Sequence, residues 1–392
     1  MNQFLAQINM KSICLVHDWL VAMRGGEKVL ENLAELFPEA PIYTLFATRK
    51  NLSPRLKERA IHTSFLQWIP GIDKFYRWLL PIFPLAIRSL NVKKYDLVIS
   101  SSHCVAKAVQ TRKDATHICY CHTPMRYLWG FEEEYFGNFP KWLRYLIRAC
   151  FGFLKKWDIE TSRSVTAFIA NSENTAEKIR NLYGKEAYII HPPIELLYGT
   201  KNSSEYKNDN YFLIVSALVP YKRIDLAIET FNKLALPLKI VGDGPLRSKL
   251  SQQIRFKGIQ LEGWANEETL QKYYAECKAL LMPGEEDFGI VPLEAQMFGK
   301  PVIAFGKGGV LETVLALNAK NVHRSVQEST GLFFYEQNSE SLGKAIQKFE
   351  SLEFNPSFIK SHALQFGADQ FQRKFMNFLN ETYPVDRSRR SG

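Results

Sequence analysis

The sequence lacks any long apolar run. Its first apolar stretch, near residues 13–16, is short and is followed at once by His17 and Asp18, which does not fit a signal peptide. No segment approaches the roughly 18 consecutive apolar residues of a membrane span. Low-complexity segments and short repeats are also absent, and the 46% hydrophobic and 23% charged content is typical of a globular protein. We therefore expect a protein of the cytoplasm.

Cysteine is scarce, with six residues in a chain of 392. Most of them stand in apolar strand-like or helical contexts, so we expect reduced thiols rather than a disulfide framework. Cys119 and Cys121 precede His122, but they alternate along a predicted strand and no second ligand pair follows at zinc spacing. We therefore expect no metal site here.

Acidic residues are fewer than basic ones, 40 against 50, which gives a formal charge of +10 and a pI of about 9.1. This balance favours anionic partners such as phosphates, nucleic acid or an anionic membrane surface. No helix-turn-helix, zinc-finger or RNA-recognition signature accompanies the charge, so we do not expect nucleic acid as a partner. Part of the excess lies in a terminal basic tail at 387–390.

Short apolar runs alternate with helical segments through two successive series. The predicted strands of the first series are 13–16, 41–46, 96–100, 117–121, 165–170 and 187–190, and those of the second are 211–216, 238–241, 259–262, 279–282 and 301–304. Such alternation predicts an α/β fold with parallel sheets. A double proline at 192–193 separates the two series. We predict Rossmann-like domains at 1–195 and 196–366, followed by a segment, 367–392, whose helix (about 368–383) returns to the first domain.

The segment 286–294 is the most informative part of the chain. The apolar run 279–282 predicts a strand that Pro283 and Gly284 end, and Pro292 suits the first turn of a helix. Glu286 would then lie at a strand's C-terminal edge and Glu294 about two turns into the following helix. Unpaired N–H groups at the helix start would lie between the two carboxylates. This arrangement suits a ligand with hydroxyls at both ends and negative charge in the middle, such as a nucleotide sugar.

Several motifs occur together, in order, with Glu286 and Glu294: Lys222, the run 241–245 (Val-Gly-Asp-Gly-Pro), and Glu312-Thr313. With these motifs the chain resembles the retaining glycosyltransferases of family 4, over nearly its whole length and most strongly from 216 to 312. The first half, with Arg24-Gly25-Gly26-Glu27 and the run 121–126, is similar to the branch that includes bacterial O-antigen mannosyltransferases. The resemblance implies the GT-B fold, two doubly wound domains facing a central cleft.

The resemblance also implies roles for residues of the first domain. Gly25 and Gly26 would approach the donor diphosphate, as exposed N–H groups before a helix can. His122 would contact the transferred sugar, through its backbone or as a donor to a hydroxyl. Arg126 would meet charge on the acceptor or on phosphate. The glycine pair and His122 have structural alternatives, an ordinary glycine turn and a structural histidine.

In the second domain, Lys222 and Arg223 would stabilise the leaving diphosphate. For this pair, the structural alternative is a solvated cation pair. Family members carry an arginine where this chain has Ala217, and we expect Arg223 to supply the missing charge. Glu294 would accept hydrogen bonds from the ribose, and Glu286 would bind hydroxyls of the donor sugar. The other residues expected at the donor are Gly242, Asp243, Gly244, Trp264, Phe288, Gly289, Ile290 and Val291. Trp264 has packing as an equal alternative.

The implied reaction is transfer of a hexose, with mannose from GDP-mannose as the best match, to a hydroxyl of a saccharide acceptor. No Asp-x-Asp motif is present, and cationic side chains with helix N-termini can replace a metal ion, so we expect neither a metal nor a cofactor. A UDP-sugar remains an alternative donor. A nucleotide-sugar epimerase or hydrolase on the same fold and a basic binding protein remain alternative functions.

Two segments, 65–90 and 139–157, are dense in aromatic and basic residues. Such composition suits an interfacial surface on an anionic membrane, with core helices as the alternative. Membrane contact would agree with a lipid-linked acceptor and with a peripheral location on the inner face of the cytoplasmic membrane.

Overall fold

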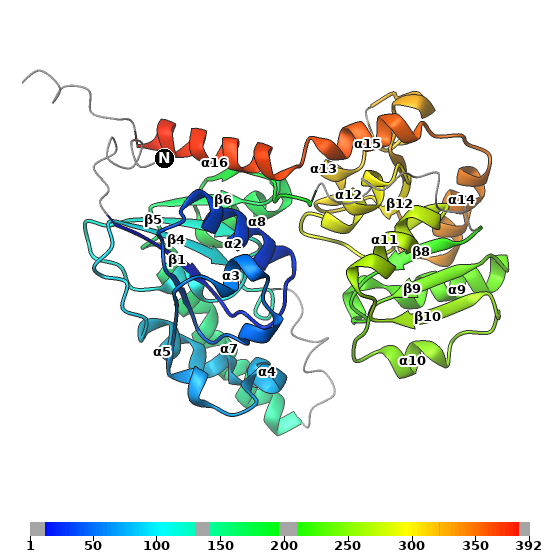
Figure 1. Cartoon of the computed structure of the whole chain (residues 1–392). Helices are drawn as coiled ribbons and strands as arrows, with labels where there is room; N and C mark the ends of the chain where they lie inside the picture. The colour runs from blue at the N-terminus through cyan, green and yellow to red at the C-terminus, as the bar shows by residue number, and fades with distance from the viewer. Residues whose placement is uncertain (1–11, 130–140, 196–209, 321, 384–392) are drawn as a thin grey trace, which may run out of the picture. The chain divides into compact units, whose positions relative to one another are not determined.

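The computed structural model describes residues 12–129, 141–195, 210–320 and 322–383, with only the helix backbone for 141–150. The chain divides into two compact units. Unit 1 comprises 1–193 together with 371–392, and unit 2 comprises 194–370. Each unit is an α/β layer structure built on one parallel sheet (Figure 1). Among the described residues, no helix is long and apolar enough to cross a membrane.

The sheet of unit 1 has the strand order β3-β2-β1-β4-β5-β6-β7, and every pairing is parallel. Its strands are β1 (Ile13–His17), β2 (Ile42–Thr44), β3 (Ile61–Thr63), β4 (Leu97–Ser102), β5 (Thr116–Cys121), β6 (Ala167–Ala170) and β7 (Ala187–Ile189). The strand ends of β1, β4 and β5 are adjacent, because His17 pairs with Ser101 and Ser102 pairs with Cys121. Residues that follow these three strands therefore gather at one edge of the sheet.

Helices cover both faces of this sheet. The helices of the unit are α2 (Gly25–Leu36), α3 (Pro54–Lys57), α4 (Ile72–Phe75), α5 (Phe83–Arg88), α7 (Lys141–Ser162), α8 (Glu173–Tyr183) and α16 (Ala368–Thr382), with 3₁₀ turns at η2 (Phe65–Trp68), η3 (Tyr76–Ile82) and η4 (Ala106–Ala108). On one face, α2 and α16 share a core with Leu15, Ile99 and Tyr120. On the other face, α5 and α7 pack with Val16 and Val98. The final helix thus belongs to the core of unit 1, where Phe371 and Phe375 are buried.

The sheet of unit 2 has the order β10-β9-β8-β11-β12-β13, again wholly parallel. Its strands are β8 (Phe212–Val215), β9 (Leu238–Val241), β10 (Ile259–Gly263), β11 (Ala279–Met282), β12 (Val302–Phe305) and β13 (Gly331–Phe334). Its helices are α9 (Ile224–Leu234), α10 (Arg247–Ser251), α11 (Glu267–Glu276), α12 (Ile290–Met297), α13 (Val310–Thr313), α14 (Ser339–Glu350) and α15 (Pro356–Leu364). Helices α9 and α14 cover one face, and α11 and α12 cover the other.

Candidate active site

In unit 2, the loops after β8 and β11 meet because Gly284 has no side chain. A Cβ at Gly284 would lie 2.5 Å from the carbonyl oxygen of Tyr221 and 2.7 Å from Cα of Lys222. Only glycine allows this approach, and it brings Lys222 against the segment that carries Glu286. The Nζ of Lys222 forms an ion pair with the Glu286 carboxylate, and both side chains are mostly buried.

The loop after β12 packs against the same segment. Glu286 forms an isolated parallel bridge with Gly308, and the N–H of Gly309 donates to the carbonyl oxygen of Glu286 at 2.8 Å. A Cβ at Gly309 would lie 2.2 Å from the carbonyl oxygen of Asp287, so this position also requires glycine. The three C-terminal strand edges of β8, β11 and β12 therefore converge around Glu286.

Helix α12 begins directly after this convergence. Gly289 precedes it with φ 101°, a conformation that favours glycine, and Ile290 and Val291 form its first turn. N–H groups of a first turn have no acceptor within their own helix. Glu294 is buried in α12, where it accepts a hydrogen bond from the Tyr274 hydroxyl at 2.8 Å. Tyr274 comes from α11 and is fully buried, so it holds Glu294 in one orientation.

The glycine turn after β9 lies on the loop after β8. Gly242 has φ 130°, and a Cβ there would lie 2.0 Å from the carbonyl oxygen of Ser216; a Cβ at Gly244 would lie 2.6 Å from that of Leu218. Asp243 is exposed and accepts from the N–H of Gly244 at 2.8 Å. These contacts explain why the turn needs glycine, and they leave the Asp243 side chain at the surface.

Trp264, Ala217 and Arg223 occupy different environments. Trp264 follows β10 and is 79% exposed, so it is not a core residue of the isolated chain. Ala217 is exposed. Arg223 adopts φ 51° before α9, and its Nε lies 3.3 Å from Oδ1 of Asp225. Compensation of Ala217 by Arg223 stays a prediction.

In unit 1, His122 follows β5 and is fixed by its backbone. Its N–H donates to the carbonyl oxygen of Ser102 at 2.9 Å, and its own carbonyl oxygen accepts from Nδ2 of Asn171 at 2.9 Å. Its ring Nε2 lies 2.8 Å from the Ser101 hydroxyl. The backbone anchors and the ring contact together hold the half-buried imidazole at the sheet edge.

Gly25 and Gly26 form the first two residues of α2, whereas the sequence analysis placed them before the helix. The reason is a cap: the N–H of Arg24 donates to the Glu27 carboxylate at 3.2 Å, which extends the helix backward. A Cβ on Gly26 would lie 3.5 Å from both Nε2 of His122 and Cε1 of His17. The helix start therefore lies directly on two imidazoles.

Asp18 organises the loop beside His122. Its carboxylate accepts the N–H groups of residues 103–106 at 2.6–3.0 Å, and Nδ1 of His103 lies 3.0 Å from it. Burial, with a smaller contribution from the charges of Arg126 and Arg24, lowers the pKa of His103 to about 3. Arg126, expected at the acceptor, is thus a half-buried cation in the electrostatic surroundings of His103.

The sequence singled out neither Tyr274 nor Ser101, and it gave no role to His17, Asp18 or Glu27. His17 and Asp18 end the first strand, and their position at a C-terminal strand edge is a signal that could have found them. Tyr274 lies twenty residues from Glu294 in an ordinary amphipathic helix, and no local pattern marks it. Among the described residues, no cluster of three or more His, Cys, Asp or Glu could hold a metal ion.

Two family models match the chain in succession. The model described as Glycosyltransferase Family 4 matches residues 23–196, and that described as Glycosyl transferases group 1 matches residues 200–365. Together they account for most of the chain, including both groups of residues described above. The chain belongs to the family 4 glycosyltransferases. As a glycosyltransferase it is an enzyme, and the sequence prediction of family and enzyme class is confirmed.

Curated relatives of this glycosyltransferase include mannosyltransferases. The alpha-1,3/1,6-mannosyltransferase ALG2 of Debaryomyces hansenii is 24% identical over 416 residues, which cover 87% of this chain and 83% of that protein. The O-antigen chain mannosyltransferase C of Escherichia coli is 30% identical over 106 residues, 26% of this chain and 29% of that protein.

Solved structures show the fold of the glycosyltransferase. Anabaena HepE in complex with UDP has a TM-score of 0.67 and 17% identity, covering 94% of this chain and all of that one. The lipopolysaccharide outer core galactosyltransferase WaaB in its apo form has a TM-score of 0.61 and 15% identity, covering 94% and 99%. The predicted α/β class and GT-B fold are confirmed.

Proposed function

We propose that this glycosyltransferase transfers mannose from GDP-mannose, with retention and without a metal ion, to a hydroxyl of a lipid-linked saccharide in the synthesis of cell-surface polysaccharide. The observation that carries the proposal is the convergence of three loops of unit 2. Lys222, Glu286 and the start of α12 meet there, and Glu294 is held by Tyr274 one helix turn away. This set supplies a cation, two carboxylates and helix N–H groups for one ligand.

Each part of that set matches one part of a nucleotide sugar. Glu294 accepts hydrogen bonds from the ribose hydroxyls, as acidic residues do in other nucleotide sites. The first turn of α12 and Lys222 face the diphosphate, because helix N-termini and cations favour anions. Glu286 binds hydroxyls of the sugar. In the ligand-free chain Lys222 neutralises Glu286, and the incoming diphosphate competes for the same cation.

The chemistry follows from charge stabilisation rather than from a protein nucleophile. As the bond from the anomeric carbon to the diphosphate breaks, Lys222 and the helix N-terminus stabilise the growing negative charge. The acceptor hydroxyl attacks from the same face, and the leaving phosphate takes its proton. His122 donates a hydrogen bond to a sugar hydroxyl. Arg223 adds charge near the diphosphate, and Gly25 and Gly26 bring N–H groups to it.

The mannosyltransferase relatives support mannose and hence GDP-mannose as the donor. A UDP-sugar is the second candidate, because HepE was crystallised with UDP and with UDP-glucose. A thermal-shift panel of GDP, UDP and ADP separates them, since a ligand raises stability only by binding the folded chain. We expect the largest rise in melting temperature with GDP, and a larger rise with UDP would reject the donor assignment.

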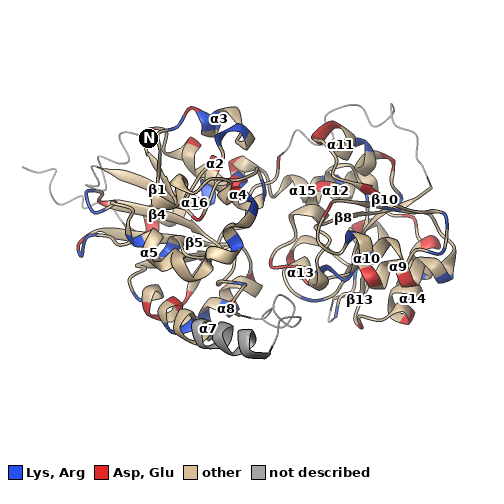
Figure 2. Cartoon of the chain, turned by 90° about the horizontal axis from the view of Figure 1, so that it is seen from below, with Lys and Arg blue, Asp and Glu red and all other residues tan. Residues whose placement is uncertain are grey.

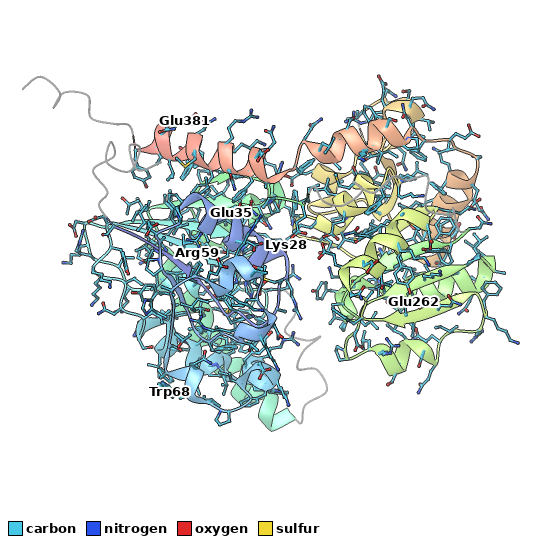
Figure 3. The ribbon with its side chains drawn as sticks, viewed as in Figure 1. Lys28, Glu35, Arg59, Trp68, Glu262 and Glu381 are labelled. Carbon is cyan, nitrogen blue, oxygen red and sulfur yellow. The ribbon has the colours of Figure 1, made fainter. Side chains whose placement is uncertain are left out.

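A surface of unit 1 supports membrane contact. Its exposed apolar side chains, hereafter the aromatic surface, lie in η2, α4, η3 and α5: Phe65, Trp68, Phe75, Trp78, Ile82 and Leu85. Trp68 is 86% exposed and projects away from the ribbon (Figure 3). Lys74, Arg77 and Arg88 are exposed among them, and Asp73 is the one acidic residue in this stretch. Figure 2 marks the basic residues along the ribbon in blue and the acidic ones in red. Exposed tryptophans beside cations suit the interface of an anionic bilayer.

The second aromatic and basic segment, 139–157, lies partly outside the described residues. Within its described part, Phe153 is 65% exposed, whereas Phe151 and Trp157 are buried. In the described part of this segment, Phe153 therefore supports the predicted interfacial surface, whereas Phe151 and Trp157 belong to the core.

Liposome flotation tests this contact. We expect the protein to bind anionic vesicles at low salt and to release at high salt, and Trp68→Ser with Trp78→Ser to reduce binding strongly. Trp264→Ser is the control, because it removes a tryptophan of unit 2 whose exposed fraction lies between those of Trp68 and Trp78. Equal binding by the double variant and the control would reject the aromatic surface as the membrane contact.

A further inference from the structure

A chain of three side chains ends at His122. The Nδ1 of His17 lies 3.1 Å from the Ser101 hydroxyl, and the same hydroxyl oxygen lies 2.8 Å from Nε2 of His122. The chain follows from strand register, because His17 on β1 pairs directly with Ser101 on β4. His17 and Ser101 are both fully buried, so neither side chain exchanges these contacts for bulk water.

The proton positions along this chain are determined by His17. Burial lowers the pKa of His17 to about 3, so its ring is neutral at physiological pH and carries one N–H. The Nε2 of His17 is buried and has no hydrogen-bond partner among the described residues. A buried N–H without an acceptor is rarer and more costly than a buried acceptor without a donor. The proton therefore resides on Nδ1, and His17 donates to the Ser101 oxygen.

The Ser101 hydroxyl determines the direction of the next hydrogen bond, the one to His122. A hydroxyl has one proton and two acceptor lone pairs. Because the Ser101 oxygen accepts from His17, its proton is directed to Nε2 of His122. Nε2 of His122 is then an acceptor, and the ring proton of neutral His122 must be on Nδ1.

We infer that Ser101 and His17 are positioning residues that hold His122 as the Nδ1–H tautomer, so that its outer nitrogen donates a hydrogen bond and does not accept a proton. The inference rests on the proposed function only for its effect on rate. A His122 in this tautomer assists transfer by donating to a hydroxyl of the donor sugar, and it is excluded as a general base through Nδ1. Free histidine favours the Nε2–H tautomer in water, so the protein reverses the default.

Nitrogen NMR of ¹⁵N-histidine-labelled full-length protein at mildly alkaline pH reports the tautomer directly. Protonated and unprotonated ring nitrogens resonate far apart, and the signal of His122 among the eight histidines is identified by its loss in His122→Gln. We expect an unprotonated Nε2 in the wild type. A protonated Nε2 in the wild type would overturn the inference, whatever the variants do.

Ser101→Ala tests the source of the preference, and Ser101→Thr restores the hydroxyl. We expect the alanine variant to shift His122 toward Nε2–H and the threonine variant to shift it back. Ser100→Ala is a matched control, because Ser100 makes a similar buried contact at 2.9 Å with Nε2 of His117 on the other face of β4. An unchanged His122 tautomer in Ser101→Ala would also overturn the inference.

Kinetics separate positioning from stability. With GDP-mannose as donor, Ser101→Ala should lower kcat roughly tenfold, the effect of one misplaced hydrogen bond, at nearly constant KM. Ser101→Thr should recover most of that loss, and Ser100→Ala should keep wild-type kcat. A wild-type kcat in Ser101→Ala would contradict the positioning role. If His122 shows the expected tautomer but the protein does not turn over GDP-mannose, the inference about His17 and Ser101 is kept and the proposed function is rejected.

Discussion

The two carboxylates of unit 2 differ in their partners, and their variants should differ accordingly. Glu294→Ala removes the ribose acceptor and should weaken GDP binding by roughly tenfold or more, the value of a charge-assisted hydrogen bond. Glu286→Ala frees Lys222 from its ion pair, so GDP binding should be kept or strengthened while transfer falls. Isothermal titration with GDP and a transfer assay measure the two effects. Full activity in both variants would show that the assignment of this segment is wrong.

Tyr274 should act through Glu294. Tyr274→Phe removes only the hydroxyl and keeps the ring, so the buried Glu294 carboxylate loses a hydrogen-bond donor at 2.8 Å. We expect a several-fold loss of GDP affinity with a destabilisation of about 1 kcal/mol. Tyr211→Phe is the control, because its hydroxyl donates to the carbonyl oxygen of Tyr273 and belongs to the same core. Equal GDP affinities for the two variants would contradict a positioning role for Tyr274.

Site residues with a local backbone signature could be predicted from the sequence. Glycines that end strands and a carboxylate at a helix start have such a signature, and the structure brings Lys222, Glu286 and Gly309 together as their strand ends require. Ser101 and Tyr274 have none, because each acts through one contact with a residue distant in the chain. Contacts of this kind depend on strand register and helix rotation, which a single sequence does not specify.

The start of α2 should respond to pH through Glu27. Burial raises the pKa of this carboxyl to about 7 from an ordinary 4.5, although hydrogen bonds and Arg24 oppose the rise. Between these pH values the folded chain binds a proton that the unfolded chain has released. The free energy of unfolding should therefore fall as pH rises from about 4.5 to about 7, and it should change no further through this group above that.

The variant Glu27→Gln measures how much Glu27 contributes to the pH dependence of the free energy of unfolding. The amide keeps an acceptor for the Arg24 N–H and cannot ionise, so the variant should lose this part of the slope. Chemical denaturation of both proteins across the window gives the difference. Parallel stability curves for wild type and variant would contradict a raised pKa for Glu27.

The glycines of the loop after β12 should be sensitive to a single methyl group. Gly309→Ala places a Cβ against the Asp287 carbonyl at 2.2 Å, so the loops around Glu286 must separate and both stability and GDP binding should fall. Gly152→Ala in α7 is the control. Among the described residues, nothing lies within 4 Å of its Cβ, and alanine should stabilise the helix by up to about 1 kcal/mol. A Gly309→Ala protein with wild-type GDP affinity would reject the close approach.

Element prediction succeeded where hydrophobic runs and caps coincide. The predicted strands 238–241 and 279–282 match β9 and β11. Strands β3 and β13 were not predicted. Strand β3 is a partly exposed edge strand of three residues, and β13 opens with Gly331, whose Cβ would lie 2.0 Å from the carbonyl oxygen of Val302. Short edges and glycine-led strands lack the pattern on which the prediction depends.

The whole molecule consists of two parallel-sheet units that carry different types of functional residue. Unit 1 holds imidazoles, a glycine helix start and the aromatic surface, and unit 2 holds the carboxylates, Lys222 and the glycine loops. The sequence predicted a boundary after 195 and a final segment from 367; the units divide at 193 and 370 because Ile194 pairs with Gly367 inside unit 2. The double proline at 192–193 is therefore the point in the sequence at which the chain passes from unit 1 to unit 2.

Incubation of the whole enzyme with GDP-mannose and no saccharide acceptor tests the proposed donor and the retention of configuration together, because water then serves as the acceptor. Proton NMR identifies the first sugar released, before it mutarotates. We expect slow release of α-mannose, which retains the configuration of the α-linked donor, without added metal and with strong loss in Glu286→Ala. Release of β-mannose, appearance of an epimerised nucleotide sugar, or turnover of a UDP-sugar in place of GDP-mannose would contradict this expectation.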